Sequence, residues 1–203
     1  MNYNIDNFDN HLIINDHGKK FLIDTGAPVS FSNETEINIF EQTYRTSQSY
    51  LGFSIEKLNE EIKYDLDALI GGNILKNHIF QVDCKNKLFS VLNEISLDNT
   101  QEYIDLDFQM DIPIIEIGVE KKTKRAFLDT GAKISYLNRK LVKHLEEIEI
   151  REDFHPTLGR FQTPIYKIPM ILNEREISLE FGVLPEKLES GLLVTGIEAI
   201  VGN

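Results

Sequence analysis

The sequence predicts a mostly β fold made of two similar lobes related by an approximate twofold axis, with a few short helices. Three features support this prediction, because each occurs twice and in the same order: an Asp-Thr-Gly-Ala turn, a Leu-Gly pair and a hydrophobic segment that contains glycine. Such repetition within one chain indicates two copies of one structural unit. The chain has 203 residues, enough for two lobes of about a hundred residues each.

The acidic turn is the strongest of the three repeats. Residues 24–33 read DTGAPVSFSN and residues 129–138 read DTGAKISYLN, so that six of the ten positions are identical. A pair of hydrophobic segments precedes each copy, at 11–14 and 20–23 in the first half and at 112–119 and 125–128 in the second. Such segments around a polar turn predict a β-hairpin that leads into each acidic turn.

The other two repeats lie downstream of the turns. SYLGF at 49–53 is similar to PTLGR at 156–160, and LIGGN at 69–73 is similar to LVTGI at 193–197. The polar stretch at 93–101 separates the two sets. We therefore expect an N-terminal lobe over 1–92, a linker over 93–101 and a C-terminal lobe over 102–203.

The remaining segments are assigned by their hydrophobic periodicity. Residues 54–62 and 138–148 are predicted to be helices, and in the second of these Leu141, Val142, Leu145 and Ile148 recur at helical spacing behind Asn138, a suitable N-cap. Residues 80–92 are predicted to form a hairpin and residues 165–184 further strands. Cys84 falls in the first strand of that hairpin and is expected to be a small buried hydrophobe.

Composition and charge narrow the function classes. Hydrophobic residues make up 41% and charged residues 27% of the chain, as in soluble globular proteins, and the net charge is −12. That charge disfavours binding to nucleic acid or to an anionic membrane. The single cysteine and the absence of a leader-like N-terminal segment lead us to expect a cytoplasmic protein, or a periplasmic or secreted one if a leader was removed.

The chemistry of the repeated turn points to a pair of carboxylates. Glycine lets the backbone come close and offers its N–H to a carboxylate, and threonine has a stiff side chain whose hydroxyl can lock two turns together. Two turns related by a twofold axis would bring Asp24 and Asp129 face to face. Two carboxylates so close share one proton, so that one can act as a general base and the other as a general acid.

The paired turns, together with LIGGNIL at 69–75, resemble the aspartic proteases of the retropepsin and pepsin type. LLVTGIEAI at 192–200 is a degenerate second copy of that segment. The resemblance implies the acid-protease fold, a peptide or protein substrate, and no cofactor. It implies a catalytic dyad of Asp24 and Asp129, supported by Thr25, Gly26, Thr130 and Gly131. It also implies flap hairpins over 44–53 and 153–164 with Gly52 and Gly159, although a Leu-Gly pair also fits an ordinary hairpin tip.

Within that family the chain is closer to the retropepsins, because alanine follows both turns, at Ala27 and Ala132. A hydroxyl there would stabilise the ionised dyad, so that alanine predicts a higher dyad pKa and activity nearer neutral pH. The pattern departs from retropepsins at Pro28 and Gly72, where that family has an Asp-Arg pair. The second lobe has no counterpart of residues 80–92, and we expect it either to lack an outer strand or to borrow one from residues 1–8.

Three functional hypotheses remain. The first is a single-chain, monomeric aspartic endopeptidase, the second a retropepsin-like module that binds peptides without cleaving them, and the third an enzyme that requires homodimerisation. The five histidines show no metal-ligand spacing with one another or with Cys84, so we expect no metal site.

Overall fold

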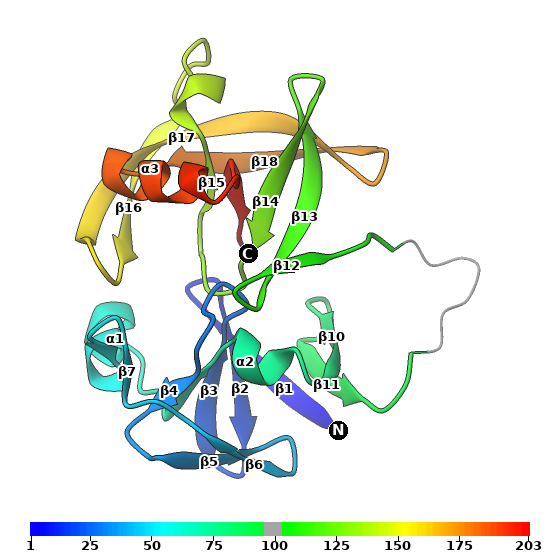
Figure 1. Ribbon diagram of the computed structural model, residues 1–203, viewed down its shortest axis with the longest axis vertical. Helices are drawn as coiled ribbons and strands as arrows, with labels where there is room; N and C mark the ends of the chain where they lie inside the picture. Colours follow the sequence, from blue (N-terminus) through cyan, green and yellow to red (C-terminus); the bar gives the residue numbers. More distant parts are fainter. Residues whose placement is uncertain (96–102) are drawn as a thin grey trace.

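The fold consists of two β lobes, which stand one above the other in Figure 1. The computed structural model describes residues 1–95 and 103–203, with Asn7 and Phe8 described by their backbone only. The prediction of a mostly β fold with two related lobes is confirmed, and the arrangement is consistent with the expected retropepsin-like fold. Most of the expected linker at 93–101 lies outside the described residues.

The first lobe is built on a seven-stranded sheet. In sheet order its strands are β10 (Ile79–Asp83), β11 (Leu88–Leu92), β1 (Asn2–Phe8), β2 (His11–Asp16), β3 (Lys19–Ile23), β9 (Ala68–Ile70) and β4 (Phe31–Ser32). Two small hairpins and two short helices complete it: β5 (Glu36–Ile39) with β6 (Gln42–Arg45), β7 (Ser49–Tyr50) with β8 (Phe53–Ser54), α1 (Ile55–Ile62) and α2 (Gly72–Leu75).

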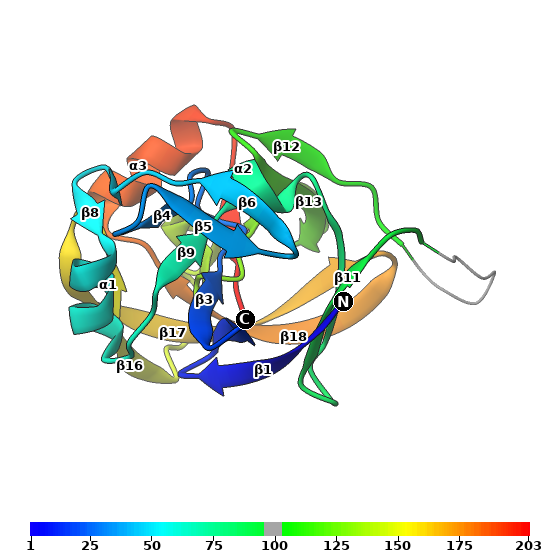
Figure 2. The same cartoon turned by 90° about the horizontal axis from the view of Figure 1, so that it is seen from below.

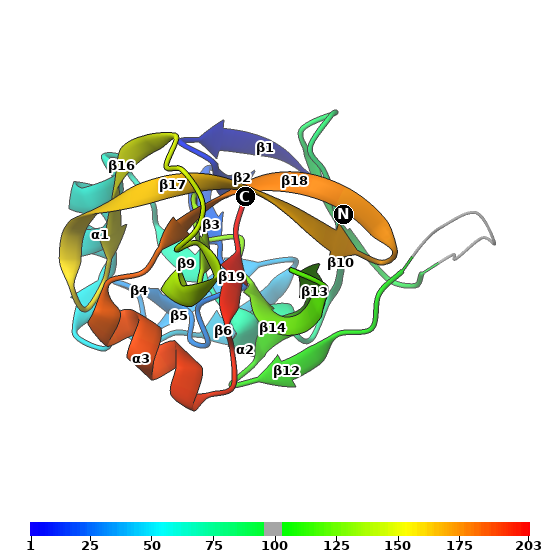
Figure 3. The same cartoon turned by 90° about the horizontal axis from the view of Figure 1, so that it is seen from above.

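The second lobe is built on an eight-stranded sheet. In sheet order its strands are β12 (Asp107–Gln109), β13 (Ile112–Val119), β14 (Lys122–Leu128), β19 (Ala199–Val201), β15 (Ser135–Leu137), β18 (Arg175–Val183), β17 (Gly159–Leu172) and β16 (Glu149–His155). The helices are the 3₁₀ turn η1 (Arg139–Leu141) and α3 (Glu186–Val194). Figures 2 and 3, which view the molecule from below and from above, both place the β16–β17 hairpin beside α1 of the first lobe.

The strands that lead to the acidic turns are hydrophobic on both faces because they separate two cores. In β2 and β3, Ile14, Phe21 and Ile23 belong to one buried cluster, while Ile13 and Leu22 belong to another. Strands covered on both faces read as continuous hydrophobic runs rather than alternating ones. This explains the predicted segments at 11–14 and 20–23, and the hairpins predicted before both turns are confirmed.

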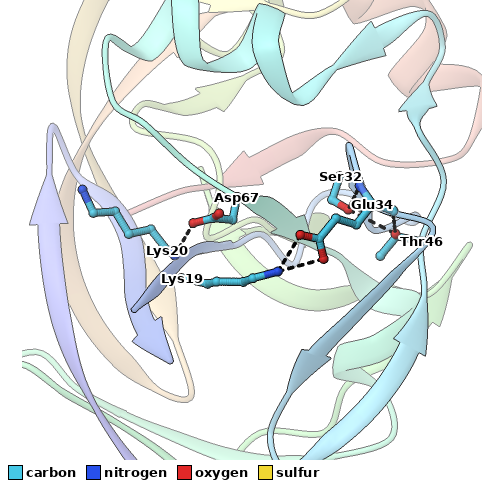
Figure 4. Close-up of polar contacts among 6 residues, drawn as sticks. All are labelled: Lys19, Lys20, Ser32, Glu34, Thr46 and Asp67. Atoms are coloured by element: carbon cyan, nitrogen blue, oxygen red, sulfur yellow. Dashed lines mark hydrogen bonds and ion pairs between the residues drawn. The ribbon is translucent and has the colours of Figure 1, made fainter. Parts of the chain in front are cut away.

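A polar network links β3 and β4, the strands on either side of the first acidic turn, to neighbouring parts of the first lobe (Figure 4). Lys19 on β3 pairs with Glu34 at 2.7 Å, and the hydroxyls of Ser32 and Thr46 both donate to the Glu34 carbonyl. Asp67 accepts the backbone N–H of Lys20 at 2.8 Å, which holds the start of β9 beside β3. These contacts fix the ends of β3 and β4 that lie away from the first acidic turn.

The two lobes repeat one arrangement around their acidic turns. Ile23 on β3 pairs in parallel with Ile70 on β9, and Leu128 on β14 pairs in the same way with Val201 on β19. The counterpart of the LIGG segment is therefore Ala199–Val201 with Gly202. The sequence prediction that placed it at 192–200 is wrong, because residues 186–194 form α3 and Gly196 is the left-handed turn that ends the helix.

Two other local predictions are also wrong. The helix expected at 138–148 is only the three-residue turn η1, because the backbone bonds run from Leu141 to Asn138 and from Leu145 to Val142, at 3₁₀ spacing. The N–H of Ile148 instead donates to the carbonyl of Ile165 on β17. Cys84 is exposed, since it lies in the turn just after β10 rather than within the strand.

Other predicted elements agree with the structure. The helix at 54–62 is α1, the hairpin at 80–92 is β10 with β11, and the strands at 165–184 are most of β17 and β18. Residues 2–8 form β1 of the first lobe, between β11 and β2, so that the second lobe does not borrow them. Within the described residues, no helix is long and apolar enough to span a membrane.

Candidate active site

The two acidic turns meet between the lobes. Each aspartate follows its strand, β3 or β14, and its N–H donates to the strand beside it, from Asp24 to Ile70 at 3.0 Å and from Asp129 to Val201 at 2.9 Å. Both carboxyl groups line a cavity of about 280 Å³ between the lobes. The sequence prediction that Asp24 and Asp129 come together agrees with this geometry.

Each carboxylate is held by its own turn in the same way. The Oδ1 atom of Asp24 accepts the N–H groups of Gly26 and Ala27 at 2.9 and 3.0 Å. The Oδ1 atom of Asp129 accepts those of Gly131 and Ala132 at 2.8 and 3.1 Å. One oxygen of each carboxyl is thus fixed, and the two groups lie within hydrogen-bond reach of each other.

The turns need glycine at positions 26 and 131 because there is no room for a side chain there. A Cβ atom on Gly26 would lie 2.1 Å from the Asp129 carboxyl carbon, and one on Gly131 would lie 2.3 Å from that of Asp24. Neither glycine has a positive φ. The aspartate carboxyl of each turn therefore packs directly against the glycine of the other turn.

The threonines lock the turns together. The Thr25 hydroxyl accepts the Thr130 N–H at 2.9 Å and donates to the Leu128 carbonyl at 2.6 Å. The Thr130 hydroxyl accepts the Thr25 N–H at 3.1 Å and donates to the Ile23 carbonyl at 2.8 Å. These four hydrogen bonds cross between the lobes and satisfy both hydroxyls, so that the two turns form one rigid unit.

The electrostatics of the pair favour retention of a proton. Burial, and next the negative charge of Asp129, raise the pKa of the Asp24 carboxyl well above its ordinary value. Burial also raises the pKa of Asp129, although the N–H groups of Gly131 and Ala132 act in the opposite direction. Two partly buried carboxyls in contact cannot both ionise easily, so the pair titrates as a unit.

The sequence did not reveal the outer support of the turns. The Ser30 hydroxyl accepts the N–H of Gly71 at 2.8 Å, and the Ser135 hydroxyl accepts that of Gly202 at 3.0 Å. The two serines are identical in the aligned turns, and this identity was the signal that could have found them. Gly202 was not predicted because the counterpart of the LIGGN segment was placed at 193–197, one element before its true position.

The predicted flap residues Gly52 and Gly159 are not among the residues that line the cavity. Each lies at the tip of a hairpin, β7–β8 or β16–β17, with φ of 76° and 80°. Residues beside them, such as Leu51 and Thr157, line the cavity. Of the first flap range, 44–53, residues 44 and 45 belong to β6, and the hairpin at 49–54 is much shorter than the one at 149–172.

The longer hairpin reaches across the cavity to the first lobe. Arg160 of β17 pairs with Glu61 of α1 at 2.9 Å, and the rings of Phe154 and Phe53 lie 5.3 Å apart. Figure 1 shows this hairpin running from the second lobe toward α1. The entrance is therefore bridged mainly from one side.

Among the residues that the structure describes, no group of three or more His, Cys, Asp or Glu side chains is arranged to hold a metal ion. His11 and His155 line the cavity, and burial lowers the pKa of both.

Comparison with known proteins gives little beyond this geometry. No family model matches the chain, and the search of curated proteins finds no match. Among solved structures, the solution structure of the simian foamy virus (mac) protease is similar at 15% identity and a TM-score of 0.33, over 44% of this chain and 86% of that one.

Proposed function

We propose that the protein is an aspartic endopeptidase in which Asp24 and Asp129 activate water for hydrolysis of a peptide bond. The observation that carries the proposal is the paired carboxyls, which lie within hydrogen-bond reach in a cavity and share supports that cross between the lobes. A dyad with one shared proton supplies a base and an acid at the same point.

The chemistry balances with that single proton. The carboxylate takes a proton from water as the water oxygen bonds the carbonyl carbon, and the protonated carboxyl gives its proton to the carbonyl oxygen. When the resulting diol collapses, the C–N bond breaks, the dyad gives its proton to the leaving nitrogen, and one diol hydroxyl returns a proton to the dyad. The pair thus ends in the state in which it began.

We propose further that one chain forms the whole site and that activity extends toward neutral pH. Both carboxylates come from the same chain, so a monomer suffices. The raised pKa values keep the singly protonated pair present at higher pH than for isolated aspartates. Alanine at positions 27 and 132 supplies no hydroxyl that would stabilise the doubly ionised form.

A binding module without turnover is the second candidate. The observation that favours it is the short β7–β8 hairpin, which leaves the first lobe with little to close over a substrate. We rank it second because it gives no role to two matched carboxyls that line one cavity.

Hydrolysis of a proteome-derived peptide library at pH 5 to 8 tests the proposal, with a pepstatin-type inhibitor as control. We expect cleavage by the wild-type chain and none by Asp24→Asn or Asp129→Asn. Peptides retained by the wild-type chain but left intact at every pH would instead favour the binding module.

A further inference from the structure

The two halves of the cavity differ in chemistry although their backbones match. Several aligned pairs that line the cavity are identical, such as Ala27 and Ala132, but at four pairs the second lobe has the more polar residue: Pro28 and Lys133, Phe31 and Tyr136, Tyr50 and Thr157, Phe53 and Arg160. Equivalent positions in a twofold site would meet equivalent parts of a substrate. The difference therefore indicates a substrate that is itself unequal about the reacting bond.

One part of the first-lobe wall is apolar. Phe31 and Phe53 belong to a buried cluster with Leu22, Leu58 and Leu69, and all five line the cavity. Phe31 is 3% exposed and Phe53 is 7% exposed. This wall suits a bulky aliphatic or aromatic side chain, because such a group would bury its surface against side chains that are already held in place.

Apart from Asp129, the second-lobe wall contains one carboxylate without a cationic partner among the residues that the structure describes. The charged side chains Asp9, Glu61 and Glu152 also line the cavity, but each already pairs with Lys133 or Arg160. Asp153 on β16 forms no such pair among the residues that the structure describes. Its carboxylate instead accepts the Tyr136 hydroxyl and, at 2.8 Å, the N–H of Phe154.

The neighbouring histidines do not neutralise Asp153. The charge of Asp153 acts on both His11 and His155, but burial is the larger influence on each and lowers the pKa of both rings. Both are therefore neutral at neutral pH. Asp153 is therefore a half-buried carboxylate that lines the cavity and is oriented by two hydrogen bonds.

We propose that the cavity selects an extended peptide with a bulky apolar side chain on one side of the cleaved bond and a lysine or arginine on the other, whose cation pairs with Asp153. Successive side chains of an extended strand point to opposite sides, so that the two residues flanking a bond at the dyad meet different lobes. The net charge of −12 also favours the approach of basic peptides. This inference rests on the proposed function for its geometry, but it can be tested without turnover.

The test measures peptide binding to the Asp24→Asn variant, in which asparagine keeps the oxygen that accepts the Gly26 and Ala27 N–H groups. The probes are fluorescein-labelled peptides that contain Phe-Lys or Lys-Phe, each matched with a norleucine and a glutamate version. Fluorescence polarisation at 0.15 M salt gives the dissociation constants. We expect the better lysine peptide to bind about 10- to 100-fold more tightly than its norleucine match, as for a hydrogen bond to a charged group, and the glutamate peptide to bind most weakly.

Two further substitutions locate the effect. Asp153→Asn in the same background should remove the preference for lysine, whereas Glu152→Gln, which changes the net charge equally at a carboxylate already paired with Arg160, should retain it. Equal binding of lysine and norleucine peptides, or a preference that survives Asp153→Asn, would overturn the inference. Hydrolysis by the wild-type chain is measured in parallel: preferred binding without cleavage would refute the proposed function and leave the specificity standing.

Discussion

Thr25 and Thr130 each use one hydroxyl to accept the other's backbone N–H and to donate to a strand carbonyl of the opposite lobe. The contact is reciprocal and crosses the boundary between the lobes directly beneath the two carboxyls. A small number of hydrogen bonds thus determines how far apart Asp24 and Asp129 lie.

We predict that Thr25→Val destabilises the protein. Valine has nearly the same shape, but it leaves the Thr130 N–H and the Leu128 carbonyl without their partner. The expected loss is about 2–4 kcal/mol in the free energy of unfolding, from two unsatisfied backbone groups. Urea denaturation at pH 7 measures it. Thr25→Ser, which keeps the hydroxyl, should lose less than about half as much, and equal losses in both variants would show that the hydroxyl is not responsible.

Gly26→Ala should reduce activity more than stability. The added Cβ would lie 2.1 Å from the Asp129 carboxyl carbon, so that this carboxyl must move away from Asp24. We expect a loss of about 1–3 kcal/mol in stability, as for overpacking, and a loss of at least about 100-fold in kcat/KM, because small displacements of reacting groups are costly. Gly191→Ala in α3 is the control, since its Cβ would meet nothing within 4 Å. Undiminished activity in Gly26→Ala would contradict the described contact.

The raised pKa of Asp24 predicts a pH-dependent effect of Asp24→Asn on stability. Above the pKa of an unfolded aspartate, about 4, the unfolded chain releases a proton that the folded chain retains, so that folding loses stability as pH rises. Asparagine removes this loss. The variant should therefore melt a few °C above the wild-type protein at pH 7, with the difference shrinking toward pH 4. Thermal melts across this range would contradict the raised pKa if the difference were constant or grew on acidification.

The alanines after the turns predict the position of the pH profile. Serine at positions 27 and 132 would bring a hydroxyl toward each carboxylate, which favours the ionised form and lowers the dyad pKa. We expect the alkaline limb of kcat/KM against pH to shift to lower pH in the Ala27→Ser, Ala132→Ser double variant. The profile is measured with one fluorogenic peptide, and a limb that stays in place would show that these positions do not set the pKa.

The sequence alone predicts the features that depend on the short segments present in two copies. The approach of Asp24 to Asp129, the interlocked threonines and the hairpins before the turns could all be predicted from short repeated segments, because these residues interact close to their own positions in the chain. Burial of both faces of β2 and β3 likewise appears directly as continuous hydrophobic runs.

Features that depend on partners distant in the sequence were missed or misplaced. Residues 193–197 contain a glycine in a hydrophobic context, but it ends a helix, and only pairing with β14 identifies Ala199–Val201 as the true counterpart of β9. The periodicity at 138–148 is helical, yet the Ile148 N–H donates to the carbonyl of Ile165 on β17. The unpaired charge of Asp153 could not be recognised until the partners of the other cavity carboxylates were known.

The most direct test of the account is a double-mutant comparison of peptide hydrolysis. The rates of the wild-type chain, Asp24→Asn, Asp129→Asn and the variant with both substitutions are measured on one peptide, with folding of each verified by thermal melting. Because the two carboxyls act as one unit, each single substitution should lower the rate at least about 1,000-fold. The variant with both substitutions should be hardly slower than either single variant. Independent, multiplicative losses, or a single variant that keeps substantial activity, would contradict a dyad formed by Asp24 and Asp129.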